Sequence, residues 1–144
     1  MGASQSGVRL DGKGVRGLAL DHHQSVANLE TSFLAVSSGK QVAVLTPTTL
    51  LAEQHYQTFK DRFASFPVEI CELSRFRKKS ENIKSVLDIK NGQVDILVGT
   101  HALFEDRVIF NSLGMVVIDE QHRFGVTQRN KLLSKGENTN LLSM

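Results

Sequence analysis

The sequence is poor in cysteine and has no long apolar run, and both scarcities restrict the kind of protein it encodes. The single cysteine, Cys71, excludes a disulfide bond within the chain and suits a reducing cytoplasm. The longest uninterrupted apolar runs are about four residues long, so we expect no transmembrane helix. Residues 1–6 contain no apolar core of the signal-peptide type. These features predict a cytoplasmic protein.

Charge of neither sign dominates, and the sequence contains no internal repeat and no low-complexity tract. The net charge of +2 does not by itself indicate a nucleic-acid partner. With 144 residues, 40% hydrophobic and 22% charged, the chain has the size and composition of one ordinary globular domain. The cations are unevenly placed, however, because four of the five residues in the segment 75–79 are Arg or Lys.

Short apolar runs that predict strands alternate with longer segments of helical periodicity along the chain. The predicted strands are residues 15–20, 41–46, 68–73, 94–98, 115–118 and a last one that begins at residue 141. The predicted helices are residues 24–36, 50–63, 79–90 and 129–135. This alternation predicts a three-layer α/β/α sandwich with a mainly parallel sheet. We expect residues 1–14 to be a flexible lead-in and residues 15–144 to form a single domain.

The strand predicted at residues 115–118 runs directly into Asp119, Glu120, Gln121 and His122. A short apolar run of this kind is typical of a strand buried on both faces of a parallel sheet. Ligand chemistry in such sheets collects at the carboxyl ends of the strands. Two acids at that edge can hold a divalent metal ion and orient a water molecule, as hydrolysis of a nucleoside triphosphate requires. The alternative is a strand that ends in a solvated acidic turn.

Three segments occur in order along the chain: residues 44–55 (VLTPTTLLAEQH), residues 99–101 (GTH) and residues 119–125 (DEQHRFG). Together they resemble the first RecA-like domain of the superfamily 2 helicases, a P-loop NTPase fold, over roughly three quarters of the chain. Residues 39–100 are similar to the bacterial transcription-repair coupling factors, whereas residues 101–144 are similar to the branch-migrating translocase RecG. The change midway indicates either a composite sequence, a chimera of the two, or a divergent relative.

The resemblance implies roles for the residues that follow the 115–118 strand. Asp119 matches the carboxylate that acts on magnesium, and Glu120 matches the catalytic base. His122 matches the residue that senses the γ-phosphate and couples it to DNA contacts, although a histidine after a strand also suits a purely structural role. The cofactor that the resemblance implies is magnesium-ATP.

The resemblance also implies a DNA-contacting surface made from three segments. Its residues are Pro47, Thr48, Thr49, Arg75, Arg77, Gly99, Thr100 and His101. Hydroxyl groups and helix amino termini suit this task because they donate hydrogen bonds to phosphates without reading sequence. Each segment has a simpler interpretation as well: a Pro-Thr helix cap, a solvated basic loop and an ordinary strand-exit loop. Phe76, inside the basic loop, suits either stacking on a base or anchoring the loop on the core.

The phosphate loop that the family requires, a glycine-rich turn ending in Lys and then Ser or Thr, is not recognisable. Counted back from the end of the first helix, this loop should fall at residues 18–25, which read LALDHHQS. Gln24 stands where the lysine belongs and Ser25 where the hydroxyl belongs, so both are degenerate nucleotide-binding candidates. Asp21 places a negative charge where the phosphates need positive potential. We expect a loss of several kcal/mol of triphosphate binding.

A second segment imitates the phosphate loop. Residues 7–14 read GVRLDGKG and fit the pattern around Gly12 and Lys13, but Gly14 replaces the Ser or Thr. A phosphate loop is held rigid by a strand before it and a helix after it, and the sequence predicts neither around this segment. We therefore interpret Gly12 and Lys13 as a decoy.

Together these features predict the ATP-binding and DNA-tracking half of an ATP-dependent double-stranded DNA translocase or helicase of DNA repair or recombination. With a degenerate phosphate loop and without the second RecA-like domain, we expect little or no ATP turnover. Magnesium-ATP is the cofactor of the family, and we expect this chain to bind none. We expect weak, salt-sensitive binding to double-stranded or branched DNA, and self-association through exposed apolar surface. The alternative is a non-enzymatic composite or engineered α/β domain that keeps the fold without the chemistry.

Overall fold

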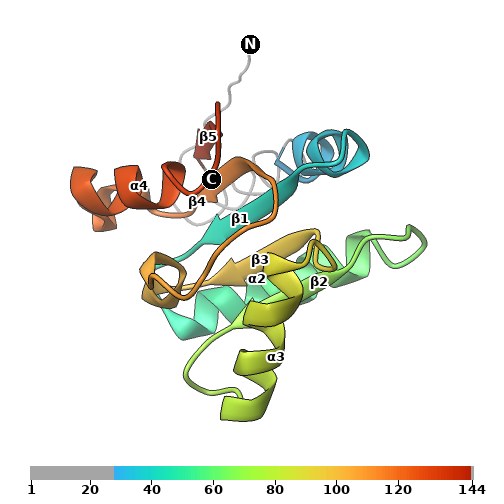
Figure 1. The fold of residues 1–144 in the computed structure, drawn as a ribbon, viewed down its shortest axis with the longest axis horizontal. Helices are drawn as coiled ribbons and strands as arrows, with labels where there is room; N and C mark the ends of the chain where they lie inside the picture. The colour runs from blue at the N-terminus through green and yellow to red at the C-terminus, as the bar shows by residue number, and fades with distance from the viewer. Residues whose placement is uncertain (1–27, 144) are drawn as a thin grey trace, which may run out of the picture.

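The computed structural model describes residues 28–143, which form a five-stranded sheet with helices on both faces (Figure 1). The strands are β1 (Gln41–Leu45), β2 (Ile70–Leu73), β3 (Ile96–Gly99), β4 (Leu113–Ile118) and β5 (Asn140–Ser143). They lie in the order β2-β3-β1-β4-β5, and every neighbouring pair is parallel. The lead-in at 1–14 and the strand at 15–20 lie outside the described residues, so they and the domain bounds stay predictions.

Four α-helical segments and two single-turn helices connect these strands. They are residues 28–37, α2 (Thr49–Arg62), α3 (Lys79–Lys90), η1 (His101–Phe104), η2 (Gln121–Arg123) and α4 (Val126–Leu133). Helices between parallel strands are required because each connection must cross from one end of the sheet to the other. Within residues 28–143, no helix is long and apolar enough to cross a membrane.

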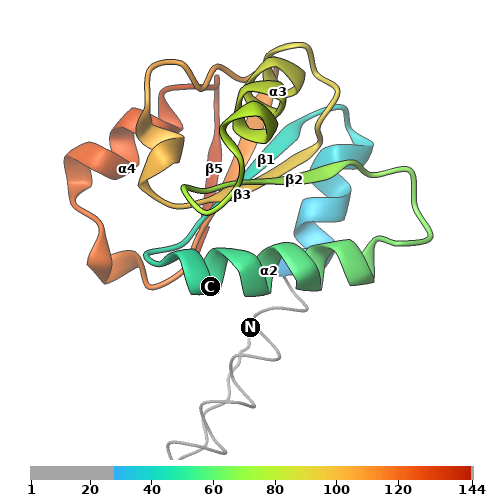
Figure 2. The same cartoon turned by 90° about the horizontal axis from the view of Figure 1, so that it is seen from below.

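Alternate residues of the central strands face opposite layers of helix. Val42 and Val44 pack with the 28–37 helix and α2, whereas Ala43 and Leu45 pack with α3 and α4 on the other face. Figure 2 shows the two layers, with α2 below the sheet and α3 and α4 above it. Because both faces of β1 are buried, its sequence is a continuous apolar run rather than an alternating one. The predicted three-layer α/β/α sandwich with a parallel sheet is confirmed.

The element bounds differ from the predictions by one to three residues at several strand and helix ends. The bounds of α3 are those predicted, but α4 begins at Val126 rather than at 129, because the Gln128 side chain accepts a hydrogen bond from the Gly125 backbone N–H at 3.0 Å. β2 lies at one edge of the described sheet, which is consistent with the period-two alternation of apolar and polar residues from Val68 to Leu73. The two single-turn helices η1 and η2 were not predicted, since three or four residues are too few to show a helical period.

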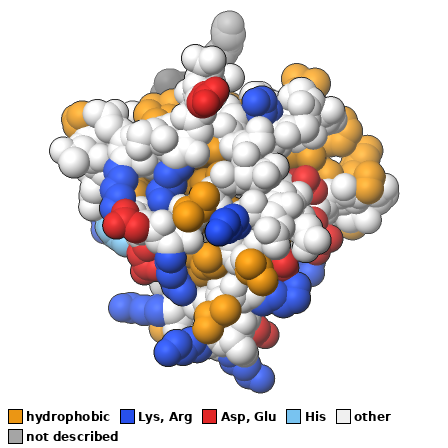
Figure 3. All heavy atoms as spheres, in the orientation of Figure 1, with side chains coloured by type: hydrophobic (Ala, Val, Ile, Leu, Met, Phe, Trp, Pro, Cys, Tyr) orange, Lys and Arg blue, Asp and Glu red, His pale blue; other side chains and the backbone are white. Residues whose placement is uncertain are grey.

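A largely apolar groove lies near the carboxyl end of α2. We call it the aromatic groove; its volume is about 490 Å³ and its apolar lining is Leu29, Phe33, Leu34, Phe63 and Phe66. The rings of Phe33 and Phe66 are 4.9 Å apart, and Leu34 is 67% exposed. Figure 3 shows hydrophobic side chains gathered at the upper right of the molecule, where the 28–37 helix lies in Figure 1.

Candidate functional site

The loops that follow the parallel strands all leave the sheet at its carboxyl edge. Thr46 follows β1, Ser74 follows β2, Thr100 follows β3 and Asp119 follows β4. Segments that are far apart in the sequence therefore meet at this edge, which is where ligands bind in open parallel sheets. The predicted catalytic acids and the predicted DNA-contacting residues belong to these loops or to the first turns of the helices after them, except Gly99, which is the last residue of β3.

A hollow of about 420 Å³ opens between the loops after β1, β2 and β3, and we call it the edge groove. Six of the eight residues predicted to contact DNA line it: Pro47, Thr48, Thr49, Arg75, Thr100 and His101. Glu105 also lines the groove, and its carboxylate is paired with Arg107 at 2.6 Å. The structure thus brings together three segments that the sequence separates by more than twenty residues each.

The amino terminus of α2 forms one wall of the edge groove. Thr48 is the N-cap of this helix, and its Oγ1 accepts a hydrogen bond from the Leu51 N–H at 3.2 Å. The Thr46 hydroxyl, which is buried, donates to the Thr48 carbonyl at 3.0 Å and fixes the turn. The first amides of any α-helix lack acceptors within the helix, and the helix dipole is positive at this end. This wall is therefore suited to a phosphate group.

The two arginines predicted to contact DNA lie in different environments. Arg75 is exposed and lines the edge groove. Arg77 instead lies 3.4 Å from the carboxylate of Glu72, and its guanidinium is 5.1 Å from the ring centroid of Tyr56. Burial raises the pKa of Glu72, and the positive charge of Arg77 acts in the opposite direction. Arg77 thus ties its loop to β2 and α2 instead of lining the groove.

Gly99 and His101 contribute to the edge groove through packing. Gly99 is buried, and its carbonyl accepts a hydrogen bond from the Thr46 N–H at 3.0 Å. The ring of His101 lies 5.8 Å from that of Phe104 and 5.5 Å from that of Phe124. Phe124 belongs to the loop that carries the acids, so an aromatic contact joins this loop to the edge groove.

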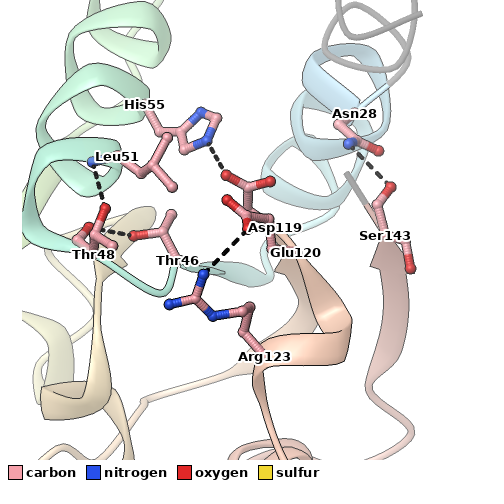
Figure 4. A network of polar contacts seen from close by, with 9 residues as sticks. All are labelled: Asn28, Thr46, Thr48, Leu51, His55, Asp119, Glu120, Arg123 and Ser143. Carbon is pink, nitrogen blue, oxygen red and sulfur yellow. Dashed lines mark hydrogen bonds and ion pairs between the residues drawn. The ribbon is translucent and has the colours of Figure 1, made fainter. Parts of the chain in front are cut away.

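Asp119 is held in place by a histidine from α2. The side chains of Asp119 and His55 are only 16% and 18% exposed, and Asp119 Oδ2 lies 2.9 Å from His55 Nε2 (Figure 4). The Asp119 backbone N–H donates to the Leu45 carbonyl at 2.9 Å, which continues the pairing of β4 with β1. The carboxylate therefore has a fixed direction at the end of a central strand.

Glu120 and His122 are less constrained than Asp119. Glu120 adopts a left-handed backbone conformation, with φ 51°, and its Oε1 lies 3.7 Å from Arg123 Nη1. A non-glycine residue in this conformation is uncommon and turns the chain sharply away from the sheet. His122, in the single turn that follows, is exposed. The Ser143 hydroxyl donates to Gln121 Oε1, which connects the acid loop to the end of β5.

A magnesium ion would depend on Asp119 at this edge. Among residues 28–143 there is no group of three or more His, Cys, Asp or Glu side chains arranged to hold a metal ion. Magnesium usually takes only one or two carboxylates and completes its shell with water and phosphate oxygens, so Asp119 fits this ion when a nucleotide supplies phosphates. Gln24, Ser25, Gly12 and Lys13, the candidates for nucleotide binding, lie outside the described residues, and their roles stay predictions.

Two residues of the site were missed at the level of sequence. His55 belongs to the 44–55 segment, but no role was assigned to it, although a spacing of seven residues from Thr48 places both on one side of a helix. Phe124 belongs to the 119–125 segment, and its packing against His101 has no signal in the sequence because the two residues are 23 positions apart.

The parallel sheet, the acids after its central strand β4 and the groove beside them define a RecA-like helicase domain. The chain belongs to the DEAD/DEAH box helicase family, whose pattern matches residues 20–140.

Among curated proteins, the chain is similar to transcription-repair-coupling factors. It is 50% identical to the factor of Haemophilus influenzae and 46% identical to that of Escherichia coli, in each case over 116 residues. These matches cover 81% of the chain and 10% of each relative, so the chain spans about a tenth of the length of these proteins. A match of 116 residues must extend past residue 100, whereas the sequence alone indicated similarity over 39–100. The composite origin stays a prediction.

Among solved structures, the chain is similar to RecG bound to a three-way DNA junction. The TM-score is 0.69 at 33% identity, over 82% of this chain and 16% of RecG. The helicase Lhr of Mycobacterium smegmatis, bound to single-stranded DNA and AMP-PNP, has a TM-score of 0.68 at 13% identity, over 83% of this chain and 16% of that one. At that identity the likeness to Lhr concerns the fold alone.

Proposed function

We propose that this chain is the DNA-tracking half of an ATP-dependent double-stranded DNA translocase or helicase that acts in DNA repair or recombination. The edge groove carries the proposal, because six residues from three separate segments converge there with chemistry suited to phosphates. The proteins similar to this chain support the proposal: the transcription-repair-coupling factors are named for a repair process, and the RecG structure contains a DNA junction. The cytoplasmic location follows from such a role.

The groove suits the sugar-phosphate backbone rather than base edges. Its polar groups include the hydroxyls of Thr48, Thr49 and Thr100, the first amides of α2 and the guanidinium of Arg75. The imidazole of His101 and the carboxylate of Glu105, which is paired with Arg107, also line it. Hydroxyls and amides donate equally well to any phosphate, so they position a strand without reading its sequence. With a single arginine in the groove, binding should be weak, and it should decrease as salt displaces this contact.

Fluorescence anisotropy with a labelled short duplex tests this proposal. We expect binding by the 144-residue chain at low salt, and we expect Arg75→Ala to weaken it several-fold and to flatten its dependence on salt. Arg62→Ala is the matched control, because Arg62 lies at the far end of α2 beside the aromatic groove. An equal loss in both variants would indicate general charge attraction, and no binding by the unmodified chain would refute the proposal.

We further propose that the chain keeps the two acids Asp119 and Glu120 but hydrolyses little or no ATP. Asp119 and Glu120 are the acids to which the resemblance assigns magnesium and water, while Gln24 stands where the family places its phosphate-loop lysine. Hydrolysis in such motors also needs a second RecA-like domain as partner, to close the nucleotide cleft. Isothermal titration with magnesium-ATP tests the claim. We expect no measurable binding, and micromolar binding that disappears in Lys13→Ala would instead make residues 7–14 a working phosphate site.

A non-enzymatic role as an assembly module is the second candidate, and the aromatic groove favours it. We propose that a second copy of the chain covers this groove, because Glu30 and Arg62 line it beside the apolar residues, so that the Glu30 of each copy could pair with the Arg62 of the other in a two-fold dimer. Sedimentation velocity should then detect a dimer that Leu34→Glu abolishes, since Leu34 is 67% exposed in the single chain and this change places a charge on the surface that the second copy would bury. A monomer at all concentrations would exclude this role.

A further inference from the structure

The loop between β2 and α3 presents an exposed aromatic ring beside the edge groove. Phe76 is 76% exposed, so it does not anchor the loop on the core. Its ring lies 5.6 Å from the guanidinium of Arg75, which itself lines the groove. Single exposed apolar side chains are common on proteins, and exposure alone would carry no meaning. The exposure of Phe76 is significant because hydrogen bonds fix the loop that carries it.

The turn on which Phe76 sits is fixed by hydrogen bonds to Ser74. Ser74 is buried, and its Oγ accepts from the Phe76 N–H at 3.3 Å. Its carbonyl accepts from the Arg77 N–H at 3.2 Å and from the Asn82 side-chain amide at 2.8 Å. The backbone on both sides of Phe76 is thus tied to a buried residue and to α3, and on this fixed turn the ring is exposed to solvent.

Arg77 fixes the other side of the turn. Its guanidinium pairs with the carboxylate of Glu72, which is 4% exposed, and packs on the ring of Tyr56 in α2. The three consecutive residues therefore have different roles. Arg75 lines the groove, Phe76 is exposed to solvent, and Arg77 anchors the turn to β2 and α2. The turn therefore leaves the apolar ring of Phe76 exposed to water, whereas a looser loop would bury this surface.

We propose that Phe76 stacks on an unpaired base of the DNA strand whose backbone occupies the edge groove. This inference rests on the proposed function and names its preferred substrate, DNA in which a duplex adjoins unpaired bases. Stacking of a base on an aromatic side chain contributes about 1–3 kcal/mol. Separating two stacked base pairs costs a few kcal/mol, so a single ring does not open an intact duplex but does favour a base that is already free.

A duplex that carries one unpaired 2-aminopurine tests this proposal, with the fully paired duplex as reference. Because 2-aminopurine fluorescence falls when the base stacks, we expect quenching on binding to the wild-type chain and to Phe76→Tyr, which keeps the ring. Phe76→Ala should abolish the quenching and should weaken binding to the unpaired probe about five-fold or more, while its affinity for the paired duplex stays within about two-fold.

Leu34→Ala is the matched control, since Leu34 is similarly exposed but lies in the aromatic groove, and it should change neither affinity nor quenching. Circular dichroism should show all variants folded, because the substituted side chains are largely in solvent. If the wild-type chain binds both probes and Phe76→Ala binds them equally well, the stacking inference fails while the proposed function stands. If the wild-type chain binds neither probe, the proposed function fails and the inference falls with it.

Discussion

A side chain at Gly99 would meet the backbone of the neighbouring strand. A Cβ atom built there lies 2.9 Å from the Leu73 carbonyl oxygen and 2.9 Å from a methyl carbon of Leu103. The first contact cannot be relieved by a rotation, because the carbonyl belongs to β2 and the two strands are paired at this point. Gly99 is therefore required by packing, which explains its place in the 99–101 segment without any contact to DNA.

We predict that Gly99→Ala lowers the free energy of unfolding by about 3 kcal/mol, the upper part of the range for overpacking, because a backbone atom is in the way. Chemical denaturation followed by circular dichroism measures this. Gly125→Ala serves as control, since its Cβ would have no neighbour closer than 4.0 Å, and we expect a loss below about 1 kcal/mol. Equal losses at the two positions would show that the space around Gly99 is not restrictive.

Glu72 is a buried carboxyl group whose ionisation opposes folding. Burial raises its pKa above the ordinary value of 4.5, so the folded state holds the proton more tightly than the unfolded state does. The stabilisation from this proton is complete below the unfolded pKa and is lost as the pH rises through the folded pKa. Arg77 offsets part of this loss by pairing with the ionised form.

We predict that Glu72→Gln gains stability relative to the wild type as the pH rises from 4 to 7, because the amide has no charge to desolvate. Urea denaturation at several pH values, with the exposed Glu69→Gln as control, provides the comparison. A relative loss of stability over the same interval would mean that the ion pair with Arg77 outweighs desolvation.

At the level of elements, α2 connects the edge groove to the acids. Thr48 caps the helix at the groove, and His55, about 10 Å further along the axis, contacts Asp119. A helix transmits a displacement of its end to the side chains two turns away because its hydrogen bonds keep it rigid. The contact between His55 and Asp119 therefore joins α2 to the acid at the end of β4.

We predict that Thr48→Ala lowers the free energy of unfolding by about 1 kcal/mol through loss of the cap, whereas Thr48→Ser keeps the hydroxyl and the stability. Thermal unfolding of the two variants measures the difference. Because the cap also orients the first amides of α2, duplex binding at low salt should weaken with alanine and persist with serine. Equal behaviour of the two variants would mean that the hydroxyl has no role at this position.

The strands and helices were predictable because the periodicity of their apolar residues matches the faces that are buried in the structure. The runs in β1 and β4 are continuously apolar since both faces of these strands are covered, and α3 has clear start and stop signals. The gathering of three segments at the edge groove was expected from the resemblance to the helicases, and their positions after parallel strands explain it. The contacts of His55 with Asp119 and of Phe124 with His101 were not predictable, because they depend on the path of loops with no period.

At the scale of the whole molecule, the two ends of α2 face different surfaces. The edge groove, with its hydroxyls and Arg75, lies at the amino end, and the aromatic groove lies at the carboxyl end. A strand of DNA and a protein partner would therefore occupy opposite ends of the sandwich without competing. This separation allows each surface to be tested independently, by one variant in each groove.

The most direct measurement is a titration of the isotopically labelled chain with a short duplex, followed by amide chemical shifts. We predict that the shifts concentrate on Thr48, Thr49, Thr100, His101 and the loop at Arg75, and that Leu34 and Phe66 in the aromatic groove stay unchanged. Raising the salt concentration should reverse them together. Shifts confined to the aromatic groove, or none at all at low salt, would contradict the claim that the carboxyl edge of the sheet holds DNA.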